Sequence, residues 1–208
     1  MSGTGARVST GNDSKQDYRT PSDLMAACYK HFGPVGFDLA ATAENAQHER
    51  YFAPDVIIEI KGTGKTKEII RHPHHDPKAY GHDAFTHSWV EVSRKFGLLW
   101  LNCEFNAIAD WSDRCRREGA EGAQILLLTP AAVGANWFVD SIASFADVYY
   151  LKGRPAFIPG QTYNKDCMIS HFGPRASGMS FVWDWRRDLI LHRWRYERER
   201  SSKELPVA

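Results

Sequence analysis

The stretch LLWLNCEF, residues 98–105, decides the expected fold. Its first four residues form a continuous apolar run, which is typical of a strand buried on both faces of a sheet. The polar residue Asn102 follows directly at the end of this strand. In open α/β sheets, ligands bind beyond the carboxyl ends of the strands. We therefore expect Asn102 to lie in a functional site.

Similar apolar segments flank this strand and alternate with segments of helical pattern. Strands are expected at 35–39, 124–128, 148–151 and 167–170, and helices at about 22–32, 107–118 and 134–145. This rhythm predicts an α/β fold, a three-layer sandwich with a mainly parallel sheet. Asp38 and Thr129 also fall at strand ends, so we expect them at the same edge as Asn102.

The length and composition suit one globular domain, expected over 17–196. Residues 1–16 are rich in Gly, Ser, Thr and Asn, which predicts a disordered tail, and 197–208 are expected to be flexible. The net charge is +1, so the whole molecule is not a polycation, and any contact with a nucleic acid needs a local basic face. The arginine-rich segment 186–200 is one candidate for such a face, and a solvated helix face is the alternative.

Other function classes find little support. The N-terminus has no apolar signal region and no apolar run approaches about 20 residues, which predicts a cytoplasmic protein without a membrane span. The four cysteines form no CxxC pair, and the histidines between 72 and 87 match no zinc spacing. We therefore expect no metal.

The turn expected at residues 102–105, directly after a buried strand, can supply the groups that methylation of an exocyclic amine of a DNA base requires. The nitrogen is a poor nucleophile, so an enzyme must accept hydrogen bonds from it and hold it in line with the methyl donor. The amide of Asn102 and a backbone carbonyl can accept these bonds. Phe105 can stack on a base that has left the duplex.

The chain also resembles a known family over about 17–172. The segments are DYRTP (17–21), FDLAATAENA (37–46), RYF (50–52), DAF through Trp89 (83–89) and WLNCEF (100–105), followed by LLTP (127–130), WF (137–138) and LKGRPAF (151–157). In order and spacing these segments resemble the phage DNA N-6-adenine methyltransferases. The resemblance implies a class I methyltransferase-like fold, S-adenosylmethionine as cofactor, DNA as partner, and transfer to N6 of adenine, in the host cell cytoplasm if the protein is phage-encoded.

The resemblance also implies roles for single residues. Thr20 and Pro21 would line the methionine end of the cofactor, and Asp38 would face the cofactor from the strand tip. Ala40 and Ala41 would let the backbone approach it closely, and Asp83 would lie beside its adenine ring. In the catalytic turn, Asn102 would accept from the target amine, Cys103 would present its backbone carbonyl, Glu104 would place a carboxylate beside the base, and Phe105 would stack.

The chain departs from the family pattern at three places. Cys103 and Glu104 replace the usual two prolines, and Ala40 replaces a second aspartate. Residues 56–82 are expected to be an insertion that recognises the target. Three alternatives therefore stay open. One is methylation of N4 of cytosine, and another is a catalytically altered or inactive DNA-binding homologue. The third is different base chemistry, such as attack on a pyrimidine by a Cys103 thiolate.

Overall fold

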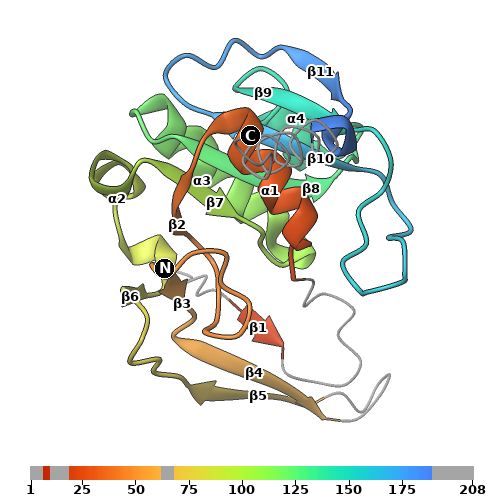
Figure 1. Cartoon of the computed structure of the whole chain (residues 1–208). Coiled ribbons are helices and arrows are strands. Elements are labelled where there is room, and N and C mark those ends of the chain that lie inside the picture. The colour runs from red at the N-terminus through yellow and green to blue at the C-terminus, as the bar shows by residue number, and fades with distance from the viewer. Residues whose placement is uncertain (1–6, 10–18, 62–67, 189–208) are drawn as a thin grey trace, which may run out of the picture.

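The centre of the molecule is a six-stranded sheet (Figure 1). The computed structural model describes residues 7–9, 19–61 and 68–188. The strand order is β11-β9-β10-β8-β7-β2, with bounds Ser180–Trp183, Ala146–Leu151, Cys167–Phe172, Ile125–Pro130, Leu98–Leu101 and Val35–Asp38. β2, β7 and β8 are parallel, β11 is parallel to β9, and β10 is antiparallel to both of its neighbours. The sheet is therefore mainly parallel, as predicted, with one reversed strand that the sequence did not reveal.

Helices cover both faces of this sheet. Helix α1 (Ser22–Phe32) packs on one face, where Trp100 of β7 joins its apolar side chains in one buried cluster. Helices α2 (Trp89–Phe96), α3 (Ile108–Ala120) and α4 (Asn136–Ser141) share a second cluster with Leu99 and Leu101. Successive residues of a strand point to opposite faces, which is why one apolar run serves both clusters. Helix α2 was not predicted, and α4 is shorter than expected.

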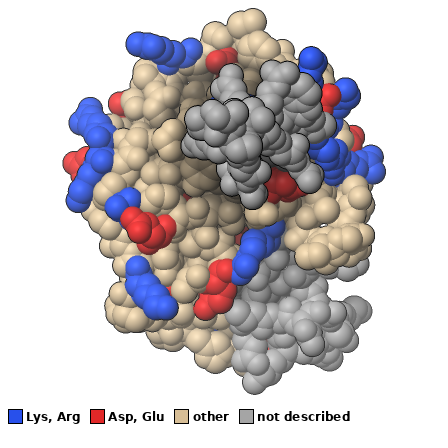
Figure 2. Space-filling model, viewed as in Figure 1, with Lys and Arg blue, Asp and Glu red and all other residues tan. Residues whose placement is uncertain are grey.

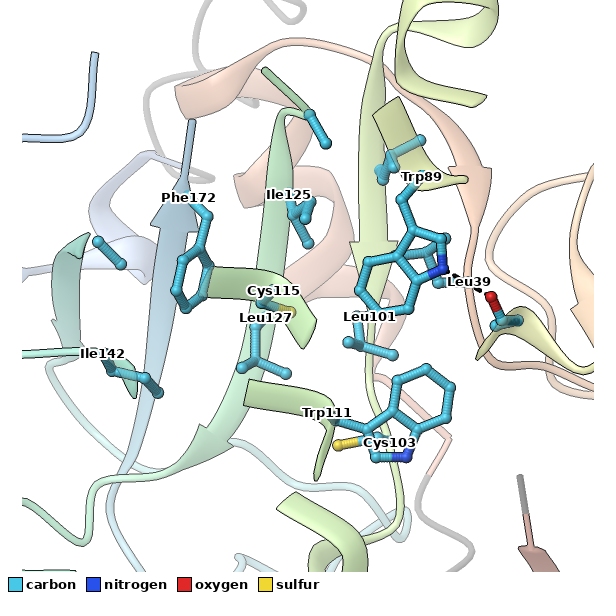
Figure 3. Close-up of a cluster of buried hydrophobic side chains, with 14 of the residues drawn as sticks. Leu39, Trp89, Leu101, Cys103, Trp111, Cys115, Ile125, Leu127, Ile142 and Phe172 are labelled. Carbon is cyan, nitrogen blue, oxygen red and sulfur yellow. Dashed lines mark hydrogen bonds between the residues drawn. The ribbon is translucent and has the colours of Figure 1, made fainter. Parts of the chain in front are cut away.

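The second cluster brings the turn at residues 102–105 close to α3. Figure 3 shows Leu101 and Leu127 of the sheet facing Trp111 and Cys115 of α3, with Cys103 beside Trp111. All five side chains are buried. The end of β7 is thus anchored in the core just where the turn begins.

A smaller region lies beyond the carboxyl edge of the main sheet (Figure 1). It contains a three-stranded sheet of β1 (Arg7–Ser9), β4 (Val56–Lys61) and β5 (Glu68–Pro73), and a strand pair of β3 (Phe52–Ala53) with β6 (Gly81–His82). Two short 3-10 helices, η2 (Ala84–Thr86) and η3 (Phe105–Ala107), precede α2 and α3.

Two expectations concern this region. The β4–β5 hairpin occupies most of the expected insertion at 56–82 and forms a sheet apart from the central one. Arg7–Ser9 pair with β4, which differs from the disorder expected for 1–16. The rest of that tail, the hairpin tip at 62–67 and the tail at 197–208 lie outside the described residues.

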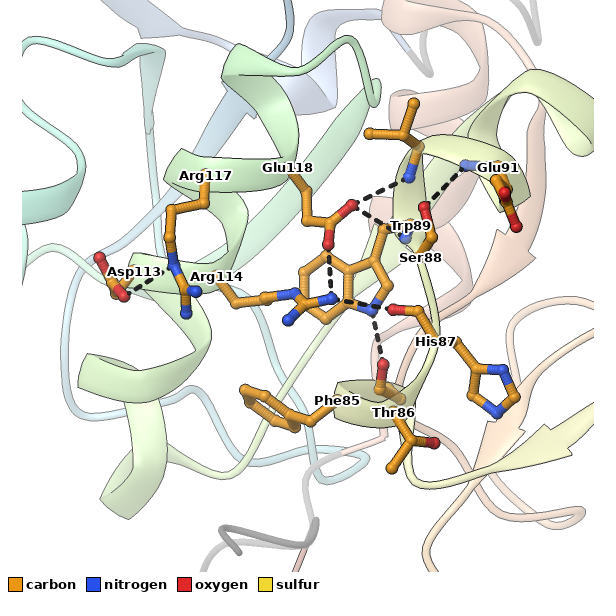
Figure 4. Close-up of polar contacts among 12 residues, drawn as sticks. Phe85, Thr86, His87, Ser88, Trp89, Glu91, Asp113, Arg114, Arg117 and Glu118 are labelled. Atoms are coloured by element: carbon orange, nitrogen blue, oxygen red, sulfur yellow. Dashed lines mark hydrogen bonds and ion pairs between the residues drawn. The ribbon is translucent and has the colours of Figure 1, made fainter. Parts of the chain in front are cut away.

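The start of α2 is held by a buried ionic network that reaches it from α3 (Figure 4). One carboxylate oxygen of Glu118 accepts hydrogen bonds from the backbone N–H groups of Trp89 and Val90, at 2.9 and 3.0 Å. Its other oxygen pairs with Arg114, which also donates to the carbonyl of His87 at 2.9 Å. Orphan N–H groups at a helix start need acceptors, and this carboxylate supplies one.

In the described part of the chain, no helix has the length and apolar character needed to cross a bilayer.

Candidate active site at the carboxyl ends of the strands

The first of the predicted site residues, Thr20, meets Asn102 of the predicted turn at the carboxyl edge of the sheet. The side-chain amide nitrogen of Asn102 donates a hydrogen bond to the hydroxyl oxygen of Thr20 at 3.1 Å. Thr20 is buried and lies just before α1, and Asn102 follows β7 directly. Two residues that are 82 positions apart in the sequence are therefore in direct contact at the end of β7.

The side chain of Cys103 points away from this edge. It is 5% exposed and belongs to the buried cluster under α3 (Figure 3). Burial raises the pKa of its thiol well above the usual range, so the thiol stays protonated at neutral pH. Only thiolates are effective nucleophiles. This geometry argues against the alternative in which Cys103 attacks a pyrimidine.

Glu104 precedes η3 as its N-cap residue and Phe105 begins the helix, and both side chains are half-buried. The carbonyl of Glu104 accepts a hydrogen bond from the N–H of Ala107 at 3.0 Å, which closes the short helix. The ring of Phe105 lies 6.1 Å from the ring of Tyr163, tilted by 54°. Tyr163 in turn makes an edge contact with Phe157 at 5.2 Å. Phe105 therefore lies at the carboxyl edge, in contact with a second aromatic residue.

The sequence reasoning missed Tyr163. It lies between β9 and β10, far along the chain from the turn at residues 102–105. One signal could have identified it, because the segment between the expected strands at 148–151 and 167–170 begins at the carboxyl edge of a parallel sheet. An aromatic residue in that connection is a candidate for the site.

Asp38 shapes the turn after β2 from inside the protein. Its carboxylate is 2% exposed and accepts hydrogen bonds from the backbone N–H groups of Ala40 and Gln47, at 3.2 and 2.9 Å. Burial raises the pKa of Asp38 to about 7, while these two hydrogen bonds favour the charged form. The carboxylate thus binds its own turn, whereas the resemblance implied that it faces the cofactor.

The turn itself is built from small residues. Ala40 is half-buried, and the N–H of Ala41 donates to the carbonyl of Phe52 at 3.1 Å, which ties the turn to β3. An open pocket of about 410 Å³ lies farther along, lined by residues between Ala43 and Tyr51 and by Lys78. None of the predicted site residues lines this pocket, so it is not the expected cofactor site.

Asp83 also has a local structural role. It is the one described residue other than glycine with a positive φ, 49°. Its carboxylate accepts a hydrogen bond from the N–H of Phe85 at 3.1 Å, and its own N–H donates to Ala53 at 2.9 Å. Burial raises its pKa. These contacts cap η2 and join it to β3.

Several remaining expectations concern aromatic and charged residues. Trp183 and Trp185 are buried against the sheet, as expected for at least two of the three C-terminal tryptophans, and Trp194 lies outside the described residues. Of the arginine-rich segment, Arg186 and Arg187 are described, and both are exposed. Over the described ranges, no group of three or more His, Cys, Asp or Glu side chains is placed to hold a metal ion.

Comparison of the chain with protein-family models, with curated proteins and with solved structures found no match.

The residues at this edge fit S-adenosylmethionine in part. The small side chains of Ala40 and Ala41 add little bulk to the turn, but the N–H groups of both are already bonded, to Asp38 and to Phe52. The polar groups of Thr20 and Asp38 are already engaged inside the protein, with Asn102 and with the turn. These side chains and N–H groups therefore offer a cofactor little polar contact at this edge.

Proposed function

We propose that this chain is an S-adenosylmethionine-dependent DNA methyltransferase that modifies N6 of adenine in a flipped base. The observation that carries this proposal is the hydrogen bond between Thr20 and Asn102. It unites the first and the catalytic motif of the resemblance at the carboxyl edge of an α/β sheet, where such sheets bind ligands. If the motifs resembled the family only by chance, there would be no reason to expect Thr20 and Asn102 in contact.

In this proposal, Asn102 orients the target amine. The bond to Thr20 fixes the plane of its amide, and an amide held in one plane presents its oxygen in one direction. That oxygen would accept a hydrogen bond from the amino group of the base. Holding the nitrogen in place supplies much of the rate in such reactions, and the cofactor supplies the methyl group.

Phe105 and Tyr163 hold the ring of the base. Two parallel rings with a base stacked between them need centroids about 7 Å apart, because each stack takes roughly half of that distance. The observed separation is 6.1 Å with a tilt of 54°. A base could stack between the two rings only if Tyr163 moved outward and its ring turned parallel to that of Phe105.

Methylation of N4 of cytosine is the second candidate, because the same groups can hold either exocyclic amine. Both candidates are tested by mass spectrometry of nucleosides from DNA of cells that express the protein. We expect N6-methyladenine with the wild type and none with Asn102→Ala.

Asn106→Ala serves as the matched control, since Asn106 is exposed in the same turn. This variant should keep the wild-type level of the modified base. N4-methylcytosine in place of N6-methyladenine would decide for the second candidate. DNA binding and cofactor binding without any methylated base would decide for an inactive homologue.

A further inference from the structure

The connection between β9 and β10 forms a hydrogen-bonded hairpin over residues 155–163, called the 155–163 hairpin below. At its tip the N–H of Gln161 donates to the carbonyl of Ile158 at 2.9 Å. The two central residues are Pro159 and Gly160, and Gly160 has a φ of 77°. Proline followed by a glycine of positive φ is the sequence of a type II turn. The turn is therefore ordered before any partner binds.

Aromatic contacts fix the base of this hairpin to the candidate site. The N–H of Tyr163 donates to the carbonyl of Pro155 at 2.9 Å, which closes the hairpin. Phe157 is buried and contacts Tyr163, and Tyr163 contacts Phe105 of the catalytic turn. The hairpin thus stands beside the place where a flipped base would lie.

The tip of the hairpin is apolar and exposed. Ile158 is 48% exposed, and Pro159 and Gly160 after it are also exposed. No charged residue occurs between 155 and 163. A hydrophobic side chain held in solvent on a rigid turn is a feature of surfaces that contact a partner.

Basic side chains surround both ends of the hairpin. They are Lys152, Arg154, Lys165, Arg186 and Arg187, and all are exposed. Arg186 donates to the backbone carbonyl of Arg154 at 2.7 Å, which brings the segment after β11 against the hairpin. Figure 2 shows Lys and Arg side chains together on the right of the molecule, where Figure 1 places this connection.

Two acidic residues accompany these cations without cancelling their role. Asp184 pairs with Lys152 at 2.7 Å and Asp166 pairs with Arg154 at 2.8 Å. Exposed ion pairs of this kind contribute little to stability, so a phosphate group can replace the carboxylate. Lys165 and Arg187 add positive charge on the same rim.

We propose that the 155–163 hairpin enters duplex DNA at the site of the flipped base. The surrounding basic residues bind phosphate groups on either side, and Ile158 fills the gap that the departing base leaves in the stack. Apolar side chains inserted between base steps are a known means of stabilising opened duplexes. This inference rests on the proposed function for the presence of a flipped base.

The phosphate contacts are tested by the salt dependence of duplex binding, measured by fluorescence anisotropy without cofactor. Each phosphate contact contributes about 0.9 to the slope of log K against log salt concentration. The double variant Lys165→Ala, Arg187→Ala should therefore lower the slope by about 2. The control is Arg94→Ala, Arg175→Ala, because both arginines are exposed and lie at the amino edge of the sheet. This control should leave the slope unchanged.

The inserted side chain is tested by Ile158→Ala in the same assay. We expect a several-fold loss of affinity at every salt concentration with an unchanged slope, because an apolar contact releases no counterions. Val139→Ala, an exposed valine on α4, is the matched control and should bind as the wild type does. Since both side chains are exposed, neither change should affect folding.

The outcomes separate this inference from the proposed function. Equal slopes for the two double variants, equal affinities for Ile158→Ala and Val139→Ala, or no duplex binding by the wild type would overturn the role of the hairpin. The nucleoside analysis decides the reaction independently. DNA binding that depends on the hairpin, without any methylated base, would refute the proposed methylation and support the role of the hairpin in DNA binding.

Discussion

Replacing Glu118 with Ala should destabilise the protein strongly, because this carboxylate serves three partners at once. It accepts two backbone hydrogen bonds at the start of α2 and pairs with Arg114. Glu118 is 7% exposed, so water cannot replace it without rearrangement. The change leaves two N–H groups and one guanidinium without this partner.

The magnitude follows from these contacts. Breaking a buried ion pair by removing one partner costs about 3–5 kcal/mol. Each hydrogen bond to a charged group contributes about 1.5–3 kcal/mol, and the two estimates overlap because the same carboxylate is counted in both. We expect a loss of about 4 kcal/mol for Glu118→Ala and about 2 kcal/mol for Glu118→Gln, which keeps an oxygen acceptor but no charge.

Urea denaturation followed by circular dichroism measures this loss. With a slope of about 2 kcal/mol per molar urea, the midpoint of Glu118→Ala should fall by about 2 M. Glu121→Ala is the control, because Glu121 is exposed three residues further along. A loss below about 1 kcal/mol for Glu118→Ala would refute the reasoning, since it would mean that the start of α2 does not depend on this carboxylate.

Three further predictions concern the site. Thr20→Val should lower kcat of the proposed methyl transfer with little change in KM for the proposed cofactor, because the Thr20 hydroxyl accepts the hydrogen bond of the Asn102 amide. Thr20→Ser keeps the hydroxyl and should restore kcat. Equal losses of kcat in both variants, measured by steady-state kinetics, would show that the hydroxyl is unimportant. Burial raises the pKa of Asp38 from 3.8 to about 7, so the folded state binds this proton more tightly than the unfolded state. The resulting stabilisation is full below about pH 4 and is lost as the pH rises to about 7, by roughly 4 kcal/mol at 1.36 kcal/mol per pKa unit. Denaturation of the wild type and Asp38→Asn across this range should show the difference between them changing by a few kcal/mol, and a constant difference would contradict it. Cys103→Ala should retain methyl transfer in a radiolabel assay, because its thiol is buried in the core, and loss of transfer in a variant that folds normally would assign the thiol a role.

The sequence predicts the framework of the sheet well because its strands are short apolar runs that end in polar residues. Residues 98–105 place both β7 and Asn102 correctly. The direction of a strand is not encoded in such a run, and β10 is antiparallel although its sequence resembles that of its neighbours. A parallel neighbour needs a crossover connection, which is usually a helix. The connection from β9 to β10 contains no described helix, and the two strands pair antiparallel.

Helix α2 was missed for a different reason. It has eight residues, which is short for a helix to be recognised from periodicity alone. Its start depends on Glu118, a residue that follows 28 or 29 positions later in the chain. The sequence does carry a local start signal, because Ser88 caps the helix by accepting from the N–H of Glu91 at 3.3 Å, and this signal was missed. The cap that Glu118 supplies from α3 leaves no trace near the helix itself.

The orientation of site residues was only partly predictable. Alternation along β7 places Cys103 on the same side as Leu101, in the core, and this could have been read from the sequence. The inward role of Asp38 depends on the N–H of Gln47, which only the folded turn brings near. Contacts across distant segments, such as Phe105 with Tyr163, need the fold.

The burial of all four cysteines has a practical consequence. Cys28, Cys103, Cys115 and Cys167 are free and buried, and burial raises the pKa of each thiol. Maleimide dyes react with exposed thiolates, so the native protein should take up dye slowly. A single cysteine introduced at Gln161, in the exposed tip of the hairpin, could then be labelled selectively without removing any native one. A fluorophore there would report directly on the approach of DNA.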